Sequence, residues 1–117
     1  MHFLYLFTRQ AYGHSLAREA LDMALATAAF DQKVSIVFLQ DGIYQLLATN
    51  DAHTIDAKPH TGVINALPLY DVENVYYVDA DRQLRNIRAD DLVAHAAAIS
   101  QATLQELMSS ADRIQSF

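Results

Sequence analysis

The stretch His2-Phe3-Leu4-Tyr5-Leu6-Phe7-Thr8 is apolar or aromatic up to Thr8 and shows no alternation of apolar and polar residues. In a strand with one solvent-exposed face, apolar and polar residues alternate, whereas a strand that is covered on both faces shows no such alternation. Residues 2–8 therefore predict a buried central strand of a parallel sheet, and this prediction decides the fold class.

Two further runs have the same character. Residues 34–39 (Val-Ser-Ile-Val-Phe-Leu) and 75–78 (Val-Tyr-Tyr-Val) are rich in β-branched and aromatic side chains, which favour strands. Residues 112–117 predict a final strand with Ile114 pointing inward. Residues 49–60 are polar and irregular, which predicts a mobile loop.

Helical patterns lie between and after these strands. Ser15 is the expected N-cap of a helix over residues 16–29, and Ser100 of a helix over residues 101–111. The expected apolar faces are Leu16, Ala20, Met23, Ala24 and Ala28 for the first, and Leu104, Leu107, Met108 and Ala111 for the second. Shorter or weaker helical stretches are expected at residues 43–47, 61–69 and 81–86. Residues 92–99 stay open, because their alanines favour helix while the segment would also suit a short strand.

Strands that alternate with helices predict an α/β fold: one domain over residues 1–117, a three-layer sandwich with a mainly parallel sheet. The chain has 117 residues, a net charge of −6 and 52% apolar residues, which excludes disorder. The excess of acidic over basic residues argues against nucleic acid as a direct partner, because binding of phosphates needs a basic face. No apolar run reaches the roughly 18–20 residues that span a bilayer, and the first residues do not resemble a signal peptide, so we expect a cytoplasmic protein.

No catalytic, cofactor-binding or metal-binding residue is assigned from the sequence. The loop expected after the first strand, residues 9–14, has a single glycine, Gly13, which is too few for a phosphate cradle. His14 beside Ser15 does not suggest a nucleophile and its base, and the five histidines lack metal-ligand spacing. We therefore expect neither a cofactor nor a metal.

Charged residues after the third expected strand allow two readings each. Asp79 and Asp81 would suit Mg²⁺, but they more often cap the turn that follows. Arg82, Arg85 and Arg88 recur every third residue and could form a small basic patch. Because aspartates bracket the patch, a carboxylate is a better partner than RNA, and a solvated face is the simplest reading of all.

The chain contains no cysteine. Without a thiol it has no thiolate nucleophile, no disulfide and no carrier for persulfide sulfur. Three tyrosines, Tyr12, Tyr44 and Tyr70, fall in loops or at element starts, where tyrosine serves either the rim of a core or a protein interface.

Several stretches together resemble the DsrF/TusC branch of the DsrE/DsrF/DsrH sulfur-relay family. They cover most of the chain: residues 17–22, 26–30, 38–47 (Phe-Leu-Gln-Asp-Gly-Ile-Tyr-Gln-Leu-Leu), 67–73 (Leu-Pro-Leu-Tyr-Asp-Val-Glu) and 111–117. The segment at 38–47 followed by Leu-Tyr-Asp is the most specific combination. Asn86 departs from the family, which tends to have glycine there, although asparagine also tolerates left-handed backbone.

The resemblance implies a five-stranded, mainly parallel sheet and a strand within residues 92–99. It also implies a heterohexamer with TusD/DsrE-like and TusB/DsrH-like subunits, in which the DsrE-type subunit carries the sulfur on a cysteine. Some relatives have a cysteine near Val78-Asp79, where this chain has none. The expected role is therefore that of a non-catalytic scaffold subunit. It would support persulfide transfer by a cysteine-bearing partner toward 2-thiolation of the tRNA wobble uridine or, in the alternative, toward DsrEFH-type sulfur oxidation.

The residues expected at a partner interface are Asp41, Gly42, Tyr44, Leu46, Leu47, Tyr70 and Asp71. Asp41-Gly42 makes a turn, and the apolar side chains after it face either the core or a partner. Two other hypotheses stay open: a small-molecule-binding protein that uses the first loop and His14, and a regulatory homo-oligomer.

Overall fold

The computed structural model describes residues 1–10, 16–47 and 57–117, with side chains from residue 62 onward in the last range. Its elements, in chain order, are β1 (His2–Phe7), α1 (Leu16–Ala28), β2 (Lys33–Phe38), the 3₁₀ helix η1 (Gln40–Leu46), α2 (Ala57–Ala66), the 3₁₀ helix η2 (Leu67–Tyr70), β3 (Asn74–Val78), α3 (Asp79–Leu84), the 3₁₀ helix η3 (Ala89–Asp91), β4 (Ala97–Ile99), α4 (Gln101–Ser110) and β5 (Arg113–Ser116).

The five strands form one sheet in the order β4-β3-β2-β1-β5, and every neighbouring pair is parallel. β1 lies beside β2 in a register that pairs His2 with Lys33 and Phe7 with Phe38. The buried run at the start of the chain is therefore an inner strand, as its sequence predicts. The α/β class and the parallel sheet are confirmed.

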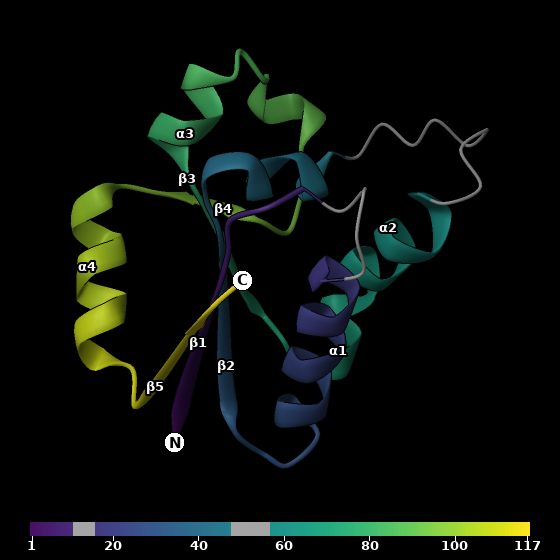
Figure 1. The fold of residues 1–117 in the computed structure, drawn as a ribbon, viewed down its shortest axis with the longest axis vertical. Helices are drawn as coiled ribbons and strands as arrows, with labels where there is room; N and C mark the ends of the chain where they lie inside the picture. The colour runs from purple at the N-terminus through teal and green to yellow at the C-terminus, as the bar shows by residue number, and fades with distance from the viewer. Residues whose placement is uncertain (11–15, 48–56) are drawn as a thin grey trace.

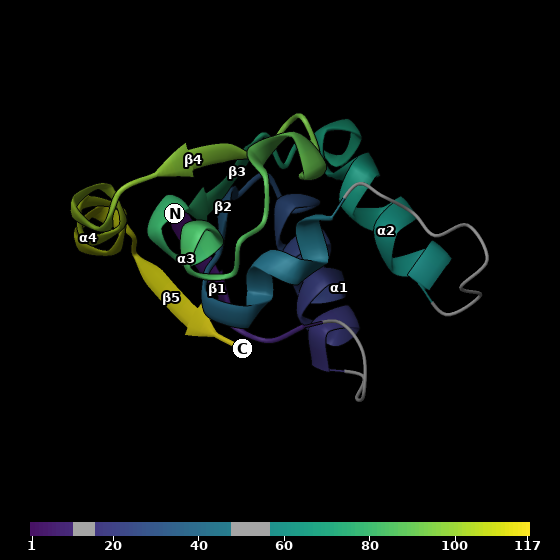
Figure 2. The same ribbon diagram turned by 90° about the horizontal axis from the view of Figure 1, so that it is seen from above.

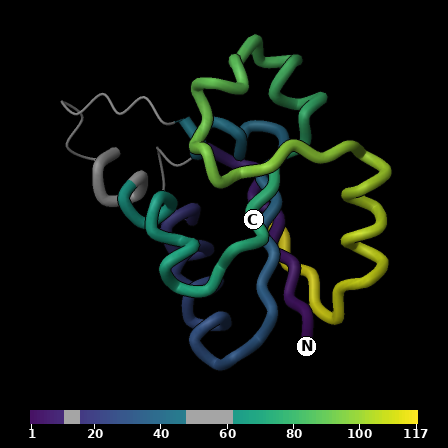
Figure 3. The backbone as a smooth tube through the Cα atoms, turned by 180° about the vertical axis from the view of Figure 1, so that it is seen from behind, coloured from purple at the N-terminus to yellow at the C-terminus, as the bar shows by residue number. Residues whose placement is uncertain are grey.

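Helices cover both faces of the sheet (Figures 1 and 2). α1 and α2 lie on one side and α4 lies on the other, which the view from behind shows as well (Figure 3). The larger core lies under α1 and α2 and includes Phe7, Phe38 and Leu21. A smaller core, including Leu6, Val37 and Leu104, lies under α4. The three layers predicted from the sequence are thus present.

Four helix predictions need correction. The buried face of α1 is Ala17, Ala20, Leu21, Ala24 and Ala28, while Met23 is 43% exposed. Met108 of α4 is likewise 39% exposed. α2 begins at Ala57, so residues 57–60 are helical and not part of an irregular loop, and η2 replaces the last turn of the helix expected at residues 61–69. The short helix after β2 already begins at Gln40.

The open segment contains a strand, as the family resemblance implies. Ala97 and Ala98 of β4 pair with Tyr76 and Tyr77 of β3. Sheet pairing here overrides the helical preference of alanine, which amounts to less than about 1 kcal/mol per residue.

Ser100 caps α4 as predicted, because its hydroxyl accepts a hydrogen bond from the Thr103 backbone N–H at 3.1 Å. Ile114 does not point into the core: it is 42% exposed. It lies on the edge strand β5 beside Leu4 and belongs to neither of the two cores. No helix in the described part of the chain is long and apolar enough to cross a membrane.

Candidate functional site

Two short helices lie together at the carboxyl edge of the sheet. η1 follows β2 and α3 follows β3, and the two pack against each other above the strand ends (Figure 1). We call this pair the carboxyl-edge cap. In a parallel sheet this edge is where binding surfaces usually form, because the strands deliver several loops to the same place.

η1 is seated directly on the backbone of β1. A Cβ atom added to Gly42 would lie 1.9 Å from the carbonyl oxygen of Phe7. The neighbouring side chains Ile43 and Leu46 are fully buried in the larger core. Glycine is therefore required here by close approach of two backbone segments, in addition to the turn that the sequence suggests.

Polar contacts join η1 to α3. The backbone N–H of Gln40 donates to the Asp81 carboxylate at 2.9 Å. Arg85 donates from Nε and Nη2 to Asp41 Oδ1 at 3.1 and 3.0 Å, and from Nη1 to the Asp81 carbonyl at 3.1 Å. The contacts of Asp81 with Gln40 and of Arg85 with Asp41 connect residues that are about forty positions apart, so the fold creates the cap.

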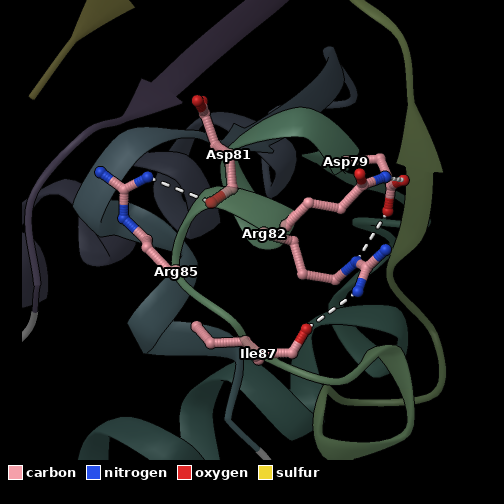
Figure 4. A network of polar contacts seen from close by, with 6 residues as sticks. Asp79, Asp81, Arg82, Arg85 and Ile87 are labelled. Atoms are coloured by element: carbon pink, nitrogen blue, oxygen red, sulfur yellow. Dashed lines mark hydrogen bonds and ion pairs between the residues drawn. The ribbon is translucent and has the colours of Figure 1, made fainter.

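A second set of contacts shapes the end of α3 (Figure 4). Asp79 accepts hydrogen bonds from Arg82 Nε and Gln83 Nε2, both at 2.7 Å, and Arg82 also donates to the Ile87 carbonyl at 2.9 Å. The hydrogen bond from Arg82, followed by that from Gln83, lowers the pKa of Asp79. Asn86 has φ 55°, so asparagine supports the left-handed turn that its sequence position suggests.

These contacts decide the readings of the charged residues. Asp79 and Asp81 lie inside the first turn of α3, whose N-cap is Val78, so the expectation that they cap it is wrong. Both carboxylates are instead engaged by groups of this chain. All three arginines find aspartates nearby, although Arg88 only approaches Asp90 at 3.7 Å on the exposed surface. No cluster of three His, Asp or Glu side chains suits a metal ion in the described residues.

Replacing Asp79 with asparagine should make the stability of the fold less sensitive to a fall in pH. Because the folded protein lowers the pKa of Asp79, the charged carboxylate stabilises the fold above the ordinary value of 3.8 and loses that effect as pH falls through the folded pKa. Asp79→Asn should therefore lower the urea midpoint at pH 7, with the difference from wild type shrinking below pH 3.8. Asp90→Asn, whose side chain is 89% exposed, is the control and should change little. An Asp79→Asn deficit of equal size at pH 7 and pH 2.5 would contradict the ionic origin.

The predicted interface residues separate into two groups. Asp41 and Tyr44 are exposed on η1, Gly42 is buried beneath them, and Leu46 is fully buried. Leu47 is half-buried, packs against the larger core and forms an isolated antiparallel bridge with Leu92. Leu46 thus serves the core, and among the described residues of this group Asp41 and Tyr44 are the ones with exposed side chains.

Tyr70 and Asp71 lie at the opposite, amino edge of the sheet, before β3 begins. Tyr70 is 59% exposed, and its neighbour Leu69 is 83% exposed. Asp71 has φ 67°, which ends η2, and its N–H bonds the Pro68 carbonyl at 3.3 Å. The fold therefore does not bring Tyr70 and Asp71 together with Asp41 and Tyr44.

Sequence reasoning missed Leu84, which is 77% exposed at the end of α3 beside Arg85. An apolar residue within a run of charged ones was the available signal. The loop after β1 was the other candidate for a ligand site. In its described part, the Arg9 carbonyl accepts a hydrogen bond from Gln45 Nε2 at 2.6 Å. Tyr12, Gly13, His14 and Ser15 lie outside the described residues.

Comparison with known proteins agrees with this architecture. The model of the DsrE/DsrF-like family matches residues 1–117. The chain is 34% identical over 113 residues to a protein named TusC homolog from Vibrio vulnificus, covering 97% of this chain and 96% of the relative. It is 31% identical, with the same coverage, to a protein of the same name from Vibrio parahaemolyticus.

Two solved structures share the fold. The crystal structure of the ychN protein from E. coli superposes with a TM-score of 0.77 at 16% identity, covering 100% of both chains. A protein of unknown function from Methanobacterium thermoautotrophicum gives a TM-score of 0.72 at 11% identity, covering 97% of this chain and 96% of the other. Because the family model spans the whole sequence and curated relatives exceed 30% identity over nearly all of it, the chain belongs to the DsrE/DsrF-like family.

Proposed function

We propose that the chain is a non-catalytic scaffold subunit of a cytoplasmic sulfur-relay complex. In this proposal it binds and positions a TusD/DsrE-like subunit that carries persulfide sulfur on a cysteine, together with a TusB/DsrH-like subunit, in a heterohexamer. The sulfur is destined for 2-thiolation of the tRNA wobble uridine. Family membership and relatives named TusC homolog support the proposal.

The observation that carries the proposal is the chemistry of the sulfur atoms. The 117 residues contain three methionines and no cysteine, and a thioether cannot form a persulfide. At the end of β3, near which the family resemblance places a cysteine in some relatives, this chain has Val78 and Asp79. Val78 is buried and Asp79 is bonded to Arg82 and Gln83. A partner must therefore supply the thiol.

The carboxyl-edge cap is the surface that we assign to the cysteine-bearing partner. Tyr44 and Leu84 expose apolar area on η1 and α3, and the Asp41–Arg85 pair lies between these elements. Tyrosine and arginine are enriched in protein interfaces, and an exposed tyrosine is a common anchor residue there. Tyr70 and Leu69 at the amino edge would then meet another subunit.

Co-expression tests the proposal. The chain with a His tag should retain untagged DsrE-like and DsrH-like subunits through affinity and size-exclusion steps, and light scattering should give the mass of a heterohexamer. A Tyr44→Ala variant should weaken retention of the DsrE-like subunit more than Phe30→Ala, which removes a side chain that is 77% exposed elsewhere. Separate elution of all three wild-type chains, or a stable homo-oligomer of this chain alone that excludes the others, would contradict the proposal.

A further inference from the structure

We propose that Asp81 and Arg85 are positioning residues that hold η1, and with it Tyr44, in the conformation that meets the partner. We call these two residues, together with their targets Gln40 and Asp41, the η1 latch. The inference rests on the proposed function, since it names the device that presents the proposed interface.

The first point of the latch is Asp81. Its target, Gln40, has φ 53°, a left-handed backbone conformation that residues other than glycine rarely adopt unless their surroundings hold it. The Asp81 carboxylate accepts the Gln40 N–H at 2.9 Å, and a charged acceptor makes this a strong hydrogen bond. The strained entry into η1 is therefore held from α3.

The second point of the latch is Arg85. Its guanidinium reaches Asp41 with two nitrogens and the Asp81 carbonyl with a third. The Arg85 side chain is only 21% exposed, whereas Asp41 is 58% exposed. A planar fork can make all three contacts at once, which the single ammonium group of lysine cannot reproduce.

The remainder of η1 is fixed differently. Ile43 and Leu46 are fully buried, so loss of the latch should leave the core closed and the chain folded. The latch holds the first turn of η1, Gln40 to Gly42, which lies just before buried Ile43 and exposed Tyr44. Since interface energy depends on a few well-placed anchors, a loosened first turn should reduce partner affinity without abolishing folding.

Hydrogen exchange and calorimetry on the full chain test the latch. Arg85→Lys and Asp81→Asn should keep the wild-type circular dichroism spectrum and increase amide exchange at Gln40 and Gly42 about tenfold. Affinity for the purified cysteine-bearing DsrE-like subunit should fall about tenfold as well. Arg88→Lys is the matched control, because its pair with Asp90 is long and both side chains are at least 76% exposed. It should change neither readout.

A charge exchange separates positioning from general stability. Asp41→Arg and Arg85→Asp should each weaken binding, and the double variant should recover part of the loss while its thermal midpoint stays near that of the singles. Unchanged exchange at Gln40 in both latch variants, or faster exchange with wild-type affinity, would overturn the inference. If the wild-type chain fails to bind the DsrE-like subunit, the proposed function fails, and the exchange experiment still decides whether the latch holds η1.

Discussion

A Gly42→Ala variant is expected to lose about 3 kcal/mol or more of unfolding free energy, or roughly 10–20 °C of thermal midpoint. The added Cβ would lie 1.9 Å from the carbonyl oxygen and 2.7 Å from the carbonyl carbon of Phe7. Both atoms are backbone, so no side-chain rotation relieves the clash. Either η1 must lift from the sheet, which exposes Ile43 and Leu46, or the end of β1 must move. Domains of this kind have only about 5–15 kcal/mol of stability in total.

Gly62→Ala is the matched control for this substitution. Gly62 lies in α2, and a Cβ built there meets nothing within 4 Å. Because alanine is the better helix former, Gly62→Ala should leave stability unchanged or raise it by about 0.5–1 kcal/mol. Scanning calorimetry measures both variants. A Gly42→Ala midpoint equal to that of the wild type would show that η1 is not seated against β1.

The sheet was predictable because its signal is local. Continuous apolar runs mark strands that are covered on both faces, and all three runs identified in the sequence became inner strands. β4 and the exposure of Ile114 were not predictable in this way. Ala97 and Ala98 form a strand through pairing with β3, and Ile114 is exposed on the edge strand β5, outside both cores. Both outcomes depend on where other elements lie.

The candidate site was predictable only in fragments. Asp41 reads as part of a turn and Arg85 as part of a basic patch, and 44 positions separate them in the sequence, so their contact exists only in the fold. Gly42 shows the same limit, because the space that a Cβ atom would need is occupied by the backbone of Phe7 in β1. Conversely, Tyr70 and Asp71 belong to the most specific family motifs, yet they lie at the opposite edge of the sheet.

Omitting this chain from a reconstituted relay should have the largest functional effect. If the chain positions the donor, removing it should lower sulfur transfer from the DsrE-like cysteine to its acceptor at least tenfold, because productive geometry contributes strongly to the rate. Restoring the wild-type chain should recover transfer, and Met-to-Leu variants at Met1, Met23 and Met108 should recover it equally, because thioethers take no part. Transfer at the full rate without the chain would contradict a scaffold role. Thiolation of tRNA by the complete set would identify the acceptor, whereas transfer only to a sulfur-oxidation partner would contradict the tRNA assignment.

The location of labelled sulfur tests the central claim most directly. The assembled complex would be loaded with ³⁵S from a cysteine desulfurase, separated on a non-reducing gel and then treated with a thiol reductant. The account predicts reductant-sensitive label on the cysteine-bearing partner and none on this chain. Covalent label on this chain, whether in the complex or alone, would contradict the account.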